Sequence, residues 1–242
     1  MAPGLGLPRG MTACLFDLDG VLTRTAVLHA AAWKEMFDGF LRDRADAGGQ
    51  PFVPFDPVRD YDEFVDGKPR ADGTRSFLAS RGIHLAEEEI TALGERKNQM
   101  VLRLIRQRGV EAYPGSVAYL DAVKAAGMAR AVVSSSTNCH DVLVAAGIDG
   151  YFDTVIDGNV AEREHLRGKP APDTFLAGAA RLGVPAGQAV VFEDAIAGVE
   201  AGSSGGFGFV VGVDRVGQAD ALRAHGATVV VRDLSELMGS GA

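Results

Sequence analysis

The amino-acid sequence predicts an α/β fold, in which a parallel, Rossmann-like sheet carries helices on both of its faces. Two observations predict this class. Short unbroken runs of apolar residues recur along the 242 residues, and such runs are typical of strands buried on both faces of a sheet. Segments with apolar residues at helical spacing lie between the runs, and this alternation of strands and helices indicates a parallel sheet.

The first predicted strand, residues 13–16, is followed by a long segment that breaks the alternation. From about Thr25 to Tyr113 the chain has helical periodicity and no convincing buried strand. We therefore expect residues 25–113 to form a small helical cap, inserted after the first strand. Residues 1–24 and 114–242 would then form the α/β core.

Within the expected cap, two stretches have the apolar spacing of amphipathic helices. One lies between Leu28 and Phe40. The other steps by three or four residues through Ala86, Ile90, Leu93, Lys97, Val101 and Leu104. The segment from Arg42 to Asp60 is rich in Gly, Pro and charged residues, and it predicts a long exposed loop.

The remaining elements belong to the core. Apolar runs predict four further strands, at residues 131–133, 190–192, 209–211 and 228–231. Helices are predicted between them where apolar residues line one face. The apolar positions are Val117, Leu120 and Val123; Val142, Leu143 and Ala146; Phe175, Leu176, Ala179 and Leu182; and Ile196 and Val199.

Composition excludes several classes of protein. The 24 basic and 32 acidic residues give a net charge of −8, which disfavours nonspecific binding of nucleic acid. No stretch approaches the ~18 apolar residues of a membrane span, and the first ten residues carry no signal-like apolar run. We therefore expect a soluble, cytoplasmic protein. Its two cysteines, Cys14 and Cys139, lack metal-ligand spacing and are expected to be free thiols.

The most informative local pattern is a pair of carboxylates, Asp17 and Asp19, directly after the first strand. Ligands of α/β sheets collect at such strand ends. In an extended segment the two side chains would point the same way, so one could attack a phosphorus atom while the other moves a proton. An acidic turn with a purely structural role is the alternative.

Further polar residues follow other predicted strands or loops: Ser134, Lys169, Glu193 and Asp194. A hydroxyl could hold phosphoryl oxygens, an ammonium group could offset their charge, and carboxylates could bind Mg²⁺. Each has a structural alternative. Ser134 could belong to a helix cap, Lys169 could be solvated, and Asp194 could cap a helix that begins near Ala195.

These residues, in this order and with a helical insertion after the first pair, resemble the haloacid dehalogenase superfamily of aspartate-nucleophile phosphotransferases. The resemblance spans nearly the whole chain. The four motifs correspond to Asp17-Leu18-Asp19-Gly20-Val21, Ser134, Lys169 and Glu193-Asp194.

The resemblance implies a role for each motif residue. Asp17 would be the nucleophile that forms an aspartyl phosphate, and Asp19 would be the general acid and base. Mg²⁺ would be the cofactor, held by Asp17, the backbone carbonyl of Asp19, Glu193 and Asp194.

Within the superfamily, the insertion looks like the cap of the β-phosphoglucomutase group. Thr25, His29 and Trp33 resemble that group's hinge and aromatic patch, and Asn138 resembles a core residue that helps hold the transferring phosphoryl group. Arg70 matches a cap arginine that grips the phosphate not undergoing transfer. The alternative for His29 and Trp33 is a packed helix face, and the alternative for Arg70 is an ordinary surface arginine.

Three features depart from that group: Arg24 where an acidic residue is common, Asp66 where a lysine is often found, and the long segment 42–60. These bear on the identity of the sugar. The phosphoryl-transfer residues match.

The resemblance implies a sugar-phosphate mutase that interconverts β-D-glucose 1-phosphate and glucose 6-phosphate through a bisphosphate intermediate. A sugar-phosphate phosphatase with the same nucleophile is the alternative, in which water attacks the aspartyl phosphate. A phosphate-binding protein without turnover is a third hypothesis, and it leaves the nucleophile and the acid/base without a use. In each case the partner is a small phosphorylated molecule.

Overall fold

The computed structural model describes residues 4–48 and 51–239, and it confirms the predicted α/β class. Six parallel strands form one sheet in the order β3-β2-β1-β4-β5-β6. They are β1 (Ala13–Phe16), β2 (Ala129–Val133), β3 (Thr154–Ile156), β4 (Ala189–Glu193), β5 (Phe209–Val213) and β6 (Val229–Val231). The sequence prediction missed β3, because this strand has only three residues and is half-buried at an edge of the sheet.

Strand β1 lies between β2 and β4, and this arrangement positions the polar residues that follow the strands. The last residue of β1 is in register with Val132 of β2 and Phe192 of β4. Asp17 follows β1, Ser134 follows β2 and Asp194 follows β4. The carboxyl ends of these three neighbouring strands therefore bring together residues that are 60 to 177 positions apart in the chain.

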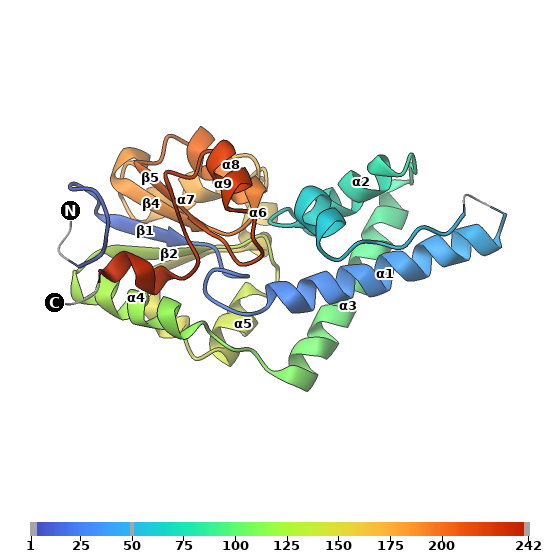
Figure 1. The fold of residues 1–242 in the computed structure, drawn as a ribbon, viewed down its shortest axis with the longest axis horizontal. Coiled ribbons are helices and arrows are strands. Elements are labelled where there is room, and N and C mark those ends of the chain that lie inside the picture. Colours follow the sequence, from blue (N-terminus) through green and yellow to red (C-terminus); the bar gives the residue numbers. More distant parts are fainter. Residues whose placement is uncertain (1–3, 49–50, 240–242) are drawn as a thin grey trace.

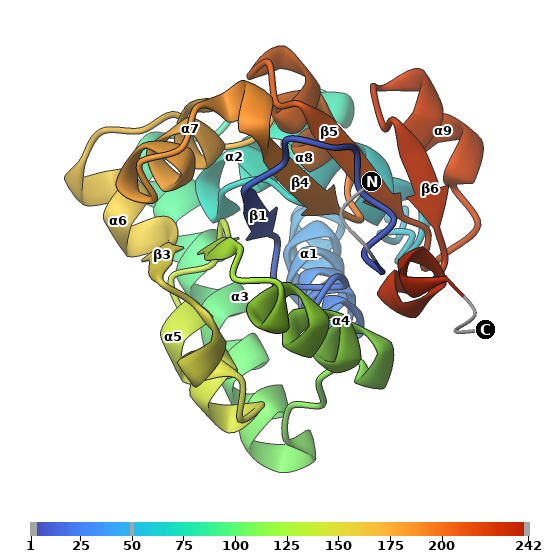
Figure 2. The same ribbon diagram turned by 90° about the vertical axis from the view of Figure 1, so that its left-hand side faces the viewer.

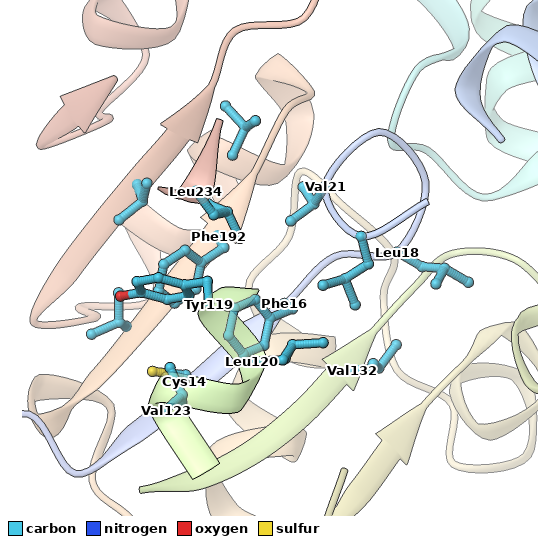
Figure 3. Packing of buried hydrophobic residues seen from close by; sticks show 14 of the residues in the cluster. Cys14, Phe16, Leu18, Val21, Tyr119, Leu120, Val123, Val132, Phe192 and Leu234 are labelled. Atoms are coloured by element: carbon cyan, nitrogen blue, oxygen red, sulfur yellow. The ribbon is translucent and has the colours of Figure 1, made fainter. Parts of the chain in front are cut away.

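Helices cover both faces of the sheet, as predicted (Figure 2). One face packs against α4 (Pro114–Ala125), α5 (Cys139–Ala145) and a 3₁₀-helix (Leu234–Met238), and the other against α7 (Asp173–Arg181), α8 (Ile196–Ser204) and α9 (Ala219–Ala224). A short helix, α6 (Gly158–Arg163), follows β3. On the first face Phe16 stacks on Phe192, with ring centroids 4.4 Å apart, and meets Tyr119 edge-on (Figure 3). These fully buried rings anchor the strand that carries Asp17.

Between β1 and β2 the chain forms α1 (Ala26–Asp46), a π-helix (Tyr61–Val65), α2 (Arg70–Ser80) and α3 (Glu87–Arg108). These helices lie beyond the carboxyl edge of the sheet (Figure 1). They enclose an apolar cluster of their own, in which Phe37 contacts the rings of Trp33, Phe55 and Phe77. We call residues 25–113 the cap.

The expectation of an exposed loop from Arg42 to Asp60 is confirmed in part: most of its described residues are exposed, and residues 51–58 form no helix or strand. It is wrong at the start of the segment and at Phe55. Helix α1 continues to Asp46, and Phe55 is only 1% exposed. The Phe55 ring packs in the cap cluster, and its backbone N–H donates to the buried carboxylate of Asp38. An aromatic residue and an internal hydrogen bond thus draw this segment into the cap, which its Gly and Pro content did not indicate.

Two smaller expectations concern membranes and thiols. In the described ranges, no helix combines the length and the apolar character that crossing a membrane requires. Cys14 and Cys139 are free, as predicted, and both are buried. Burial raises the pKa of both thiols, so they remain protonated and unreactive at neutral pH.

Candidate active site

A buried ion-pair network surrounds Asp17 at the end of β1. The ammonium group of Lys169 donates to Asp17 Oδ1 and to Glu193 Oε1, both at 2.5 Å, and to the Val133 carbonyl at 3.1 Å. Lys169 is 2% exposed, which excludes the solvated alternative. Burial lowers the pKa of Lys169, but the adjacent carboxylates outweigh this effect and raise it overall, so the group stays charged.

Three buried carboxylates at the strand ends lie close enough to share one cation. Asp17, Glu193 and Asp194 can each offer an oxygen within 4.8 Å of the other two. Against the attraction of Lys169, burial raises the pKa of Asp17 to about 6 and that of Glu193 to about 7. Burial also raises the pKa of Asp194 well above its ordinary value, with Asp66 and Glu193 adding repulsion. Burial and mutual repulsion thus disfavour the ionised form of these groups, and a bound cation would offset this cost; their hard oxygen donors suit one such as Mg²⁺.

Asp194 does not cap α8, contrary to the structural alternative. The residue at that helix cap is Ala195, whose side chain accepts no hydrogen bond, and the N–H of Ala195 donates to Glu193 Oε2 at 3.0 Å and not to Asp194. The Asp194 carboxylate instead lies against Gly20, where an added Cβ would sit 1.7 Å from its Oδ2. Gly20 also has a φ of +85°, so both its backbone and this close approach require glycine.

Hydrogen bonds from the start of the cap hold Asp19 in place. Thr25 Oγ1 donates to Asp19 Oδ1, and Thr23 Oγ1 lies 2.7 Å from Thr25 Oγ1. Burial raises the pKa of Asp19, against the lowering effect of the Thr25 hydrogen bond. A raised pKa favours a carboxyl group that both donates and accepts a proton near neutral pH.

His29 links Asp19 to the cap. Its Nε2 lies 3.6 Å from Asp19 Oδ1, and its Nδ1 lies 3.0 Å from Lys97 Nζ. Burial and the nearby charge of Lys97 lower the pKa of His29 well below its ordinary value, so the imidazole is neutral. The ammonium group of Lys97 can only donate a hydrogen bond, so Nδ1 of His29 accepts it. The imidazole proton is therefore assigned to Nε2, which faces Asp19.

A cavity of about 630 Å³ lies between the cap and the core. Its walls include eight of the candidate site residues named by the sequence analysis: Asp17, Asp19, His29, Trp33, Arg70, Ser134, Asn138 and Asp194. Thr25, Lys169 and Glu193 lie behind the wall. Thr25 contacts Asp19, Lys169 contacts Asp17, and Glu193 contacts Lys169, so these three side chains support the two aspartates without lining the cavity.

Polar contacts between the cap and the core lie along the same cavity. Arg70, the first residue of α2, donates from Nη2 to Thr137 Oγ1 of the core at 3.1 Å and from Nη1 to the Gly94 carbonyl of the cap at 3.3 Å. Asn138 Nδ2 donates to Asn98 Oδ1 of the cap at 2.8 Å. Arg70 is thus no free surface side chain, and it presents a guanidinium group at the junction of cap and core.

Ser134 is 3% exposed and its Oγ accepts the Ser136 N–H at 3.1 Å. Helix α5 begins at Cys139, with Asn138 at its cap, so Ser134 is not a helix cap. Trp33 does pack as the alternative suggested, stacked on Phe37 at 5.1 Å, while its other side reaches the cavity.

A family model described as haloacid dehalogenase-like hydrolase matches residues 11–206. The chain belongs to this superfamily. The matched segment contains every motif residue of the site, from Asp17 to Asp194.

Relatives place this haloacid dehalogenase-like chain in the β-phosphoglucomutase-like group. It is 53% identical to a β-phosphoglucomutase of Mycobacterium bovis, over 97% of this chain and 94% of the relative. A β-phosphoglucomutase of Bacillus subtilis is 34% identical, over 94% and 92%. The crystal structure of β-phosphoglucomutase from Clostridium difficile superposes with a TM-score of 0.76 at 29% identity, covering 94% and 93% of the two chains.

Among the site residues of this haloacid dehalogenase-like protein that the sequence analysis missed is Lys97. It is 6% exposed, lines the cavity and places Nζ 4.8 Å from the centre of the Trp33 ring. Burial lowers its pKa to about 7. The sequence does carry a sign of this role, because Lys97 occupies a position in the apolar stripe of α3 where an apolar core residue is expected.

Asp66, noted as a departure from the group, also reaches the site. It lines the cavity on the cap side and accepts a hydrogen bond from Tyr61. Burial raises the pKa of Asp66 to about 8, against that hydrogen bond, and the charges of Glu193 and Asp17 add to the rise. Arg24 lies apart from the cavity lining, with its guanidinium over the ring of Tyr113.

Proposed function

We propose that the protein is a β-phosphoglucomutase, which interconverts β-D-glucose 1-phosphate and glucose 6-phosphate. One observation carries the proposal: a single cavity is lined both by Asp17, which Lys169 binds from behind, and by Arg70, whose guanidinium lies at the cap–core junction. A mutase must hold two phosphates at once, whereas a hydrolase needs to hold one. The 53% identity to a β-phosphoglucomutase over almost the full chain supports the same conclusion.

In this mechanism Asp17 carries the phosphoryl group between the two positions of the sugar. Lys169 binds Oδ1, which leaves Oδ2 to attack phosphorus. When a substrate hydroxyl takes the group back, its oxygen forms the new bond to phosphorus as the bond to Asp17 breaks. The released proton passes to the carboxylate of Asp19, which returns a proton to the leaving oxygen in the opposite direction.

The cap residues orient the proton-transfer group and the second phosphate. Thr25 and the neutral His29 fix the position of the Asp19 carboxyl group. Arg70 would bind the phosphate that is not transferred, since a guanidinium group can bind phosphate with two hydrogen bonds. Ser134, Asn138 and Trp33 line the same cavity.

Asp17, Glu193, Asp194 and the backbone carbonyl of Asp19 would hold Mg²⁺. When bound, the cation offsets the charge of the carboxylates and of the phosphoryl oxygens.

Asp194→Ala is expected to weaken Mg²⁺ binding, because the cation loses one of its few carboxylate ligands. The loss of affinity should be at least the ~10–100-fold that removal of an outer partner of a metal site costs. Titrating activity with Mg²⁺ measures it, and excess Mg²⁺ should restore part of the rate. Asp220→Ala, which removes a fully exposed carboxylate from α9, is the control. Full activity of the unmodified protein in a strong chelator would refute the metal assignment.

Arg70→Ala should separate the mutase from the phosphatase. Charge-assisted hydrogen bonds are worth ~1.5–3 kcal/mol each, so mutase kcat/KM should fall roughly tenfold or more. Hydrolysis of acetyl phosphate, which has no second phosphate to bind, should barely change. The matched control is Arg103→Ala, because Arg103 is a half-exposed cap arginine paired with Glu35. A parallel fall in both activities would mean that Arg70 supports the fold of the cap.

The proposed function is tested by supplying α- and β-D-glucose 1-phosphate separately, with Mg²⁺ and a trace of a glucose bisphosphate primer. Formation of glucose 6-phosphate from the β anomer alone is the expected result. Release of inorganic phosphate without glucose 6-phosphate would favour the phosphatase. Binding with no turnover of either anomer would favour the phosphate-binding protein.

A further inference from the structure

The cap touches the core at a second place, which lines the same cavity. The cap loop, residues 67–69, lies against two core segments that adjoin the site. Ser135 Oγ donates to the Gly67 carbonyl at 2.7 Å, and a Cβ on Gly67 would sit 2.8 Å from the Cβ of Ala195. Ala195 directly follows the metal-site residue Asp194, so this loop contacts the segment that carries it.

The tightest contact joins Pro69 of the cap loop to Gly168 of the core. A Cβ on Gly168 would lie 2.0 Å from Pro69 Cγ and 2.6 Å from Cδ, but 3.4 Å from Cβ. The φ of Gly168 is not positive, so its backbone conformation does not require glycine. The absence of a side chain at this position is therefore explained by the approach of the proline ring.

This contact has little freedom to adjust. The ring of Pro69 cannot rotate away, and Gly168 is followed by Lys169, which is fixed by its bonds to Asp17 and Glu193. Carbon atoms pack at about 3.5–4.0 Å, so one extra methyl group at Gly168 would push the cap loop back by roughly 1.5–2 Å.

We propose that Gly168 is a positioning residue: its contact with Pro69 sets how closely the cap approaches the core, and thereby decides whether the phosphoryl group passes to a sugar hydroxyl or to water. The inference rests on the proposed function for the identity of the sugar. Closure of a cap excludes water from a reactive intermediate and aligns the acceptor.

The competing step is hydrolysis. A water oxygen forms a bond to the phosphorus of the aspartyl phosphate as the bond to the Asp17 oxygen breaks. One proton of the water passes to Asp19, and the products are inorganic phosphate and the free Asp17 carboxylate. A displaced cap admits this water and misaligns the sugar hydroxyl.

The test compares wild type, Gly168→Ala and the double variant Gly168→Ala/Pro69→Ala. Acetyl phosphate phosphorylates Asp17, and the lifetime of the phosphoenzyme is measured without sugar. The ratio of inorganic phosphate to glucose 6-phosphate is then measured with β-D-glucose 1-phosphate. In Gly168→Ala the lifetime should shorten and the ratio should rise roughly tenfold to a hundredfold, because a misplacement of about 1 Å can cost 10²-fold in an aligned transfer.

The double variant is the decisive arm. Pro69→Ala removes Cγ and Cδ and leaves the Cβ, which is at the ordinary contact distance of 3.4 Å from the new methyl group. Both the lifetime and the ratio should therefore return toward wild type. A disturbance of Lys169 by the substitution next to it would not be relieved by trimming the proline, so failure of this rescue would overturn the proposal.

Two further variants complete the design. Gly150→Ala is the matched control, because an added Cβ there meets nothing within 4 Å and its φ is not positive. Ser135→Ala removes the hydrogen bond to the cap loop without adding atoms, and it should shift both readouts in the same direction as Gly168→Ala. Unchanged readouts in both Ser135→Ala and Gly168→Ala would refute the inference. If wild type makes no glucose 6-phosphate, the proposed function fails, while the phosphoenzyme lifetime still tests the contact.

Discussion

Asp17→Asn is expected to abolish both mutase and phosphatase turnover, because an amide cannot form the aspartyl phosphate that either route requires. The loss should be on the order of 10⁴–10⁶-fold, the range seen when a member of a covalent catalytic unit is removed from another enzyme. Trapping of the phosphoenzyme with labelled acetyl phosphate measures the effect directly. The wild-type protein should become labelled, and the variant should not.

The fold of this variant should persist. Lys169 keeps its bonds to Glu193 and to the Val133 carbonyl, so the buried ammonium group retains a charged partner and a neutral one. Thermal unfolding of the variant, beside that of Asp220→Asn as a surface control, separates loss of chemistry from loss of structure. Turnover close to wild type in a folded Asp17→Asn protein would remove Asp17 from its role and the proposed mechanism with it.

Asp19→Asn is expected to slow turnover of sugar phosphates by ~10²–10⁴-fold, the usual contribution of a general acid or base. Asparagine can still accept the hydrogen bond from Thr25, so the geometry at the start of the cap is retained. The variant loses the proton that the carboxyl group exchanges with the substrate. The raised pKa of the buried Asp19 suits it to that exchange. Single-turnover kinetics with β-D-glucose 1-phosphate measure the effect.

Acetyl phosphate provides the internal control for this variant. Acetate is a good leaving group that departs without a proton, so phosphorylation of Asp17 by acetyl phosphate should fall much less than phosphorylation by a sugar phosphate. Equal losses with the two donors would show that Asp19 supports the geometry of Asp17 and does not transfer the proton.

The sequence by itself determined the α/β class and the residues at the strand ends. Buried parallel strands need unbroken apolar runs, so β1 and β4 are visible in the sequence, whereas the half-buried three-residue β3 is not. Because carboxyl ends of neighbouring parallel strands meet at one edge, residues that follow them are expected to converge. Asp17 and Asp194 do converge there.

The tertiary structure alone decided which of these residues face the cavity and which support them from behind. Thr25 holds Asp19, and Lys169 bridges Asp17 and Glu193, because hydrogen-bond partners depend on distances between segments that the sequence does not encode locally. The same reason applies to Phe55, which an apparent loop buries in the cap.

The contacts between cap and core were likewise invisible in the sequence. Lys97 stands in an apolar stripe, and only packing against Trp33 and His29 shows why a lysine is stable there. The sequence around Gly168 gives no sign of its contact with Pro69, which lies 99 positions earlier. A local sequence pattern indicates the secondary structure and burial that its own segment prefers. The contacts between cap and core depend instead on how the packed surfaces of these two units fit together.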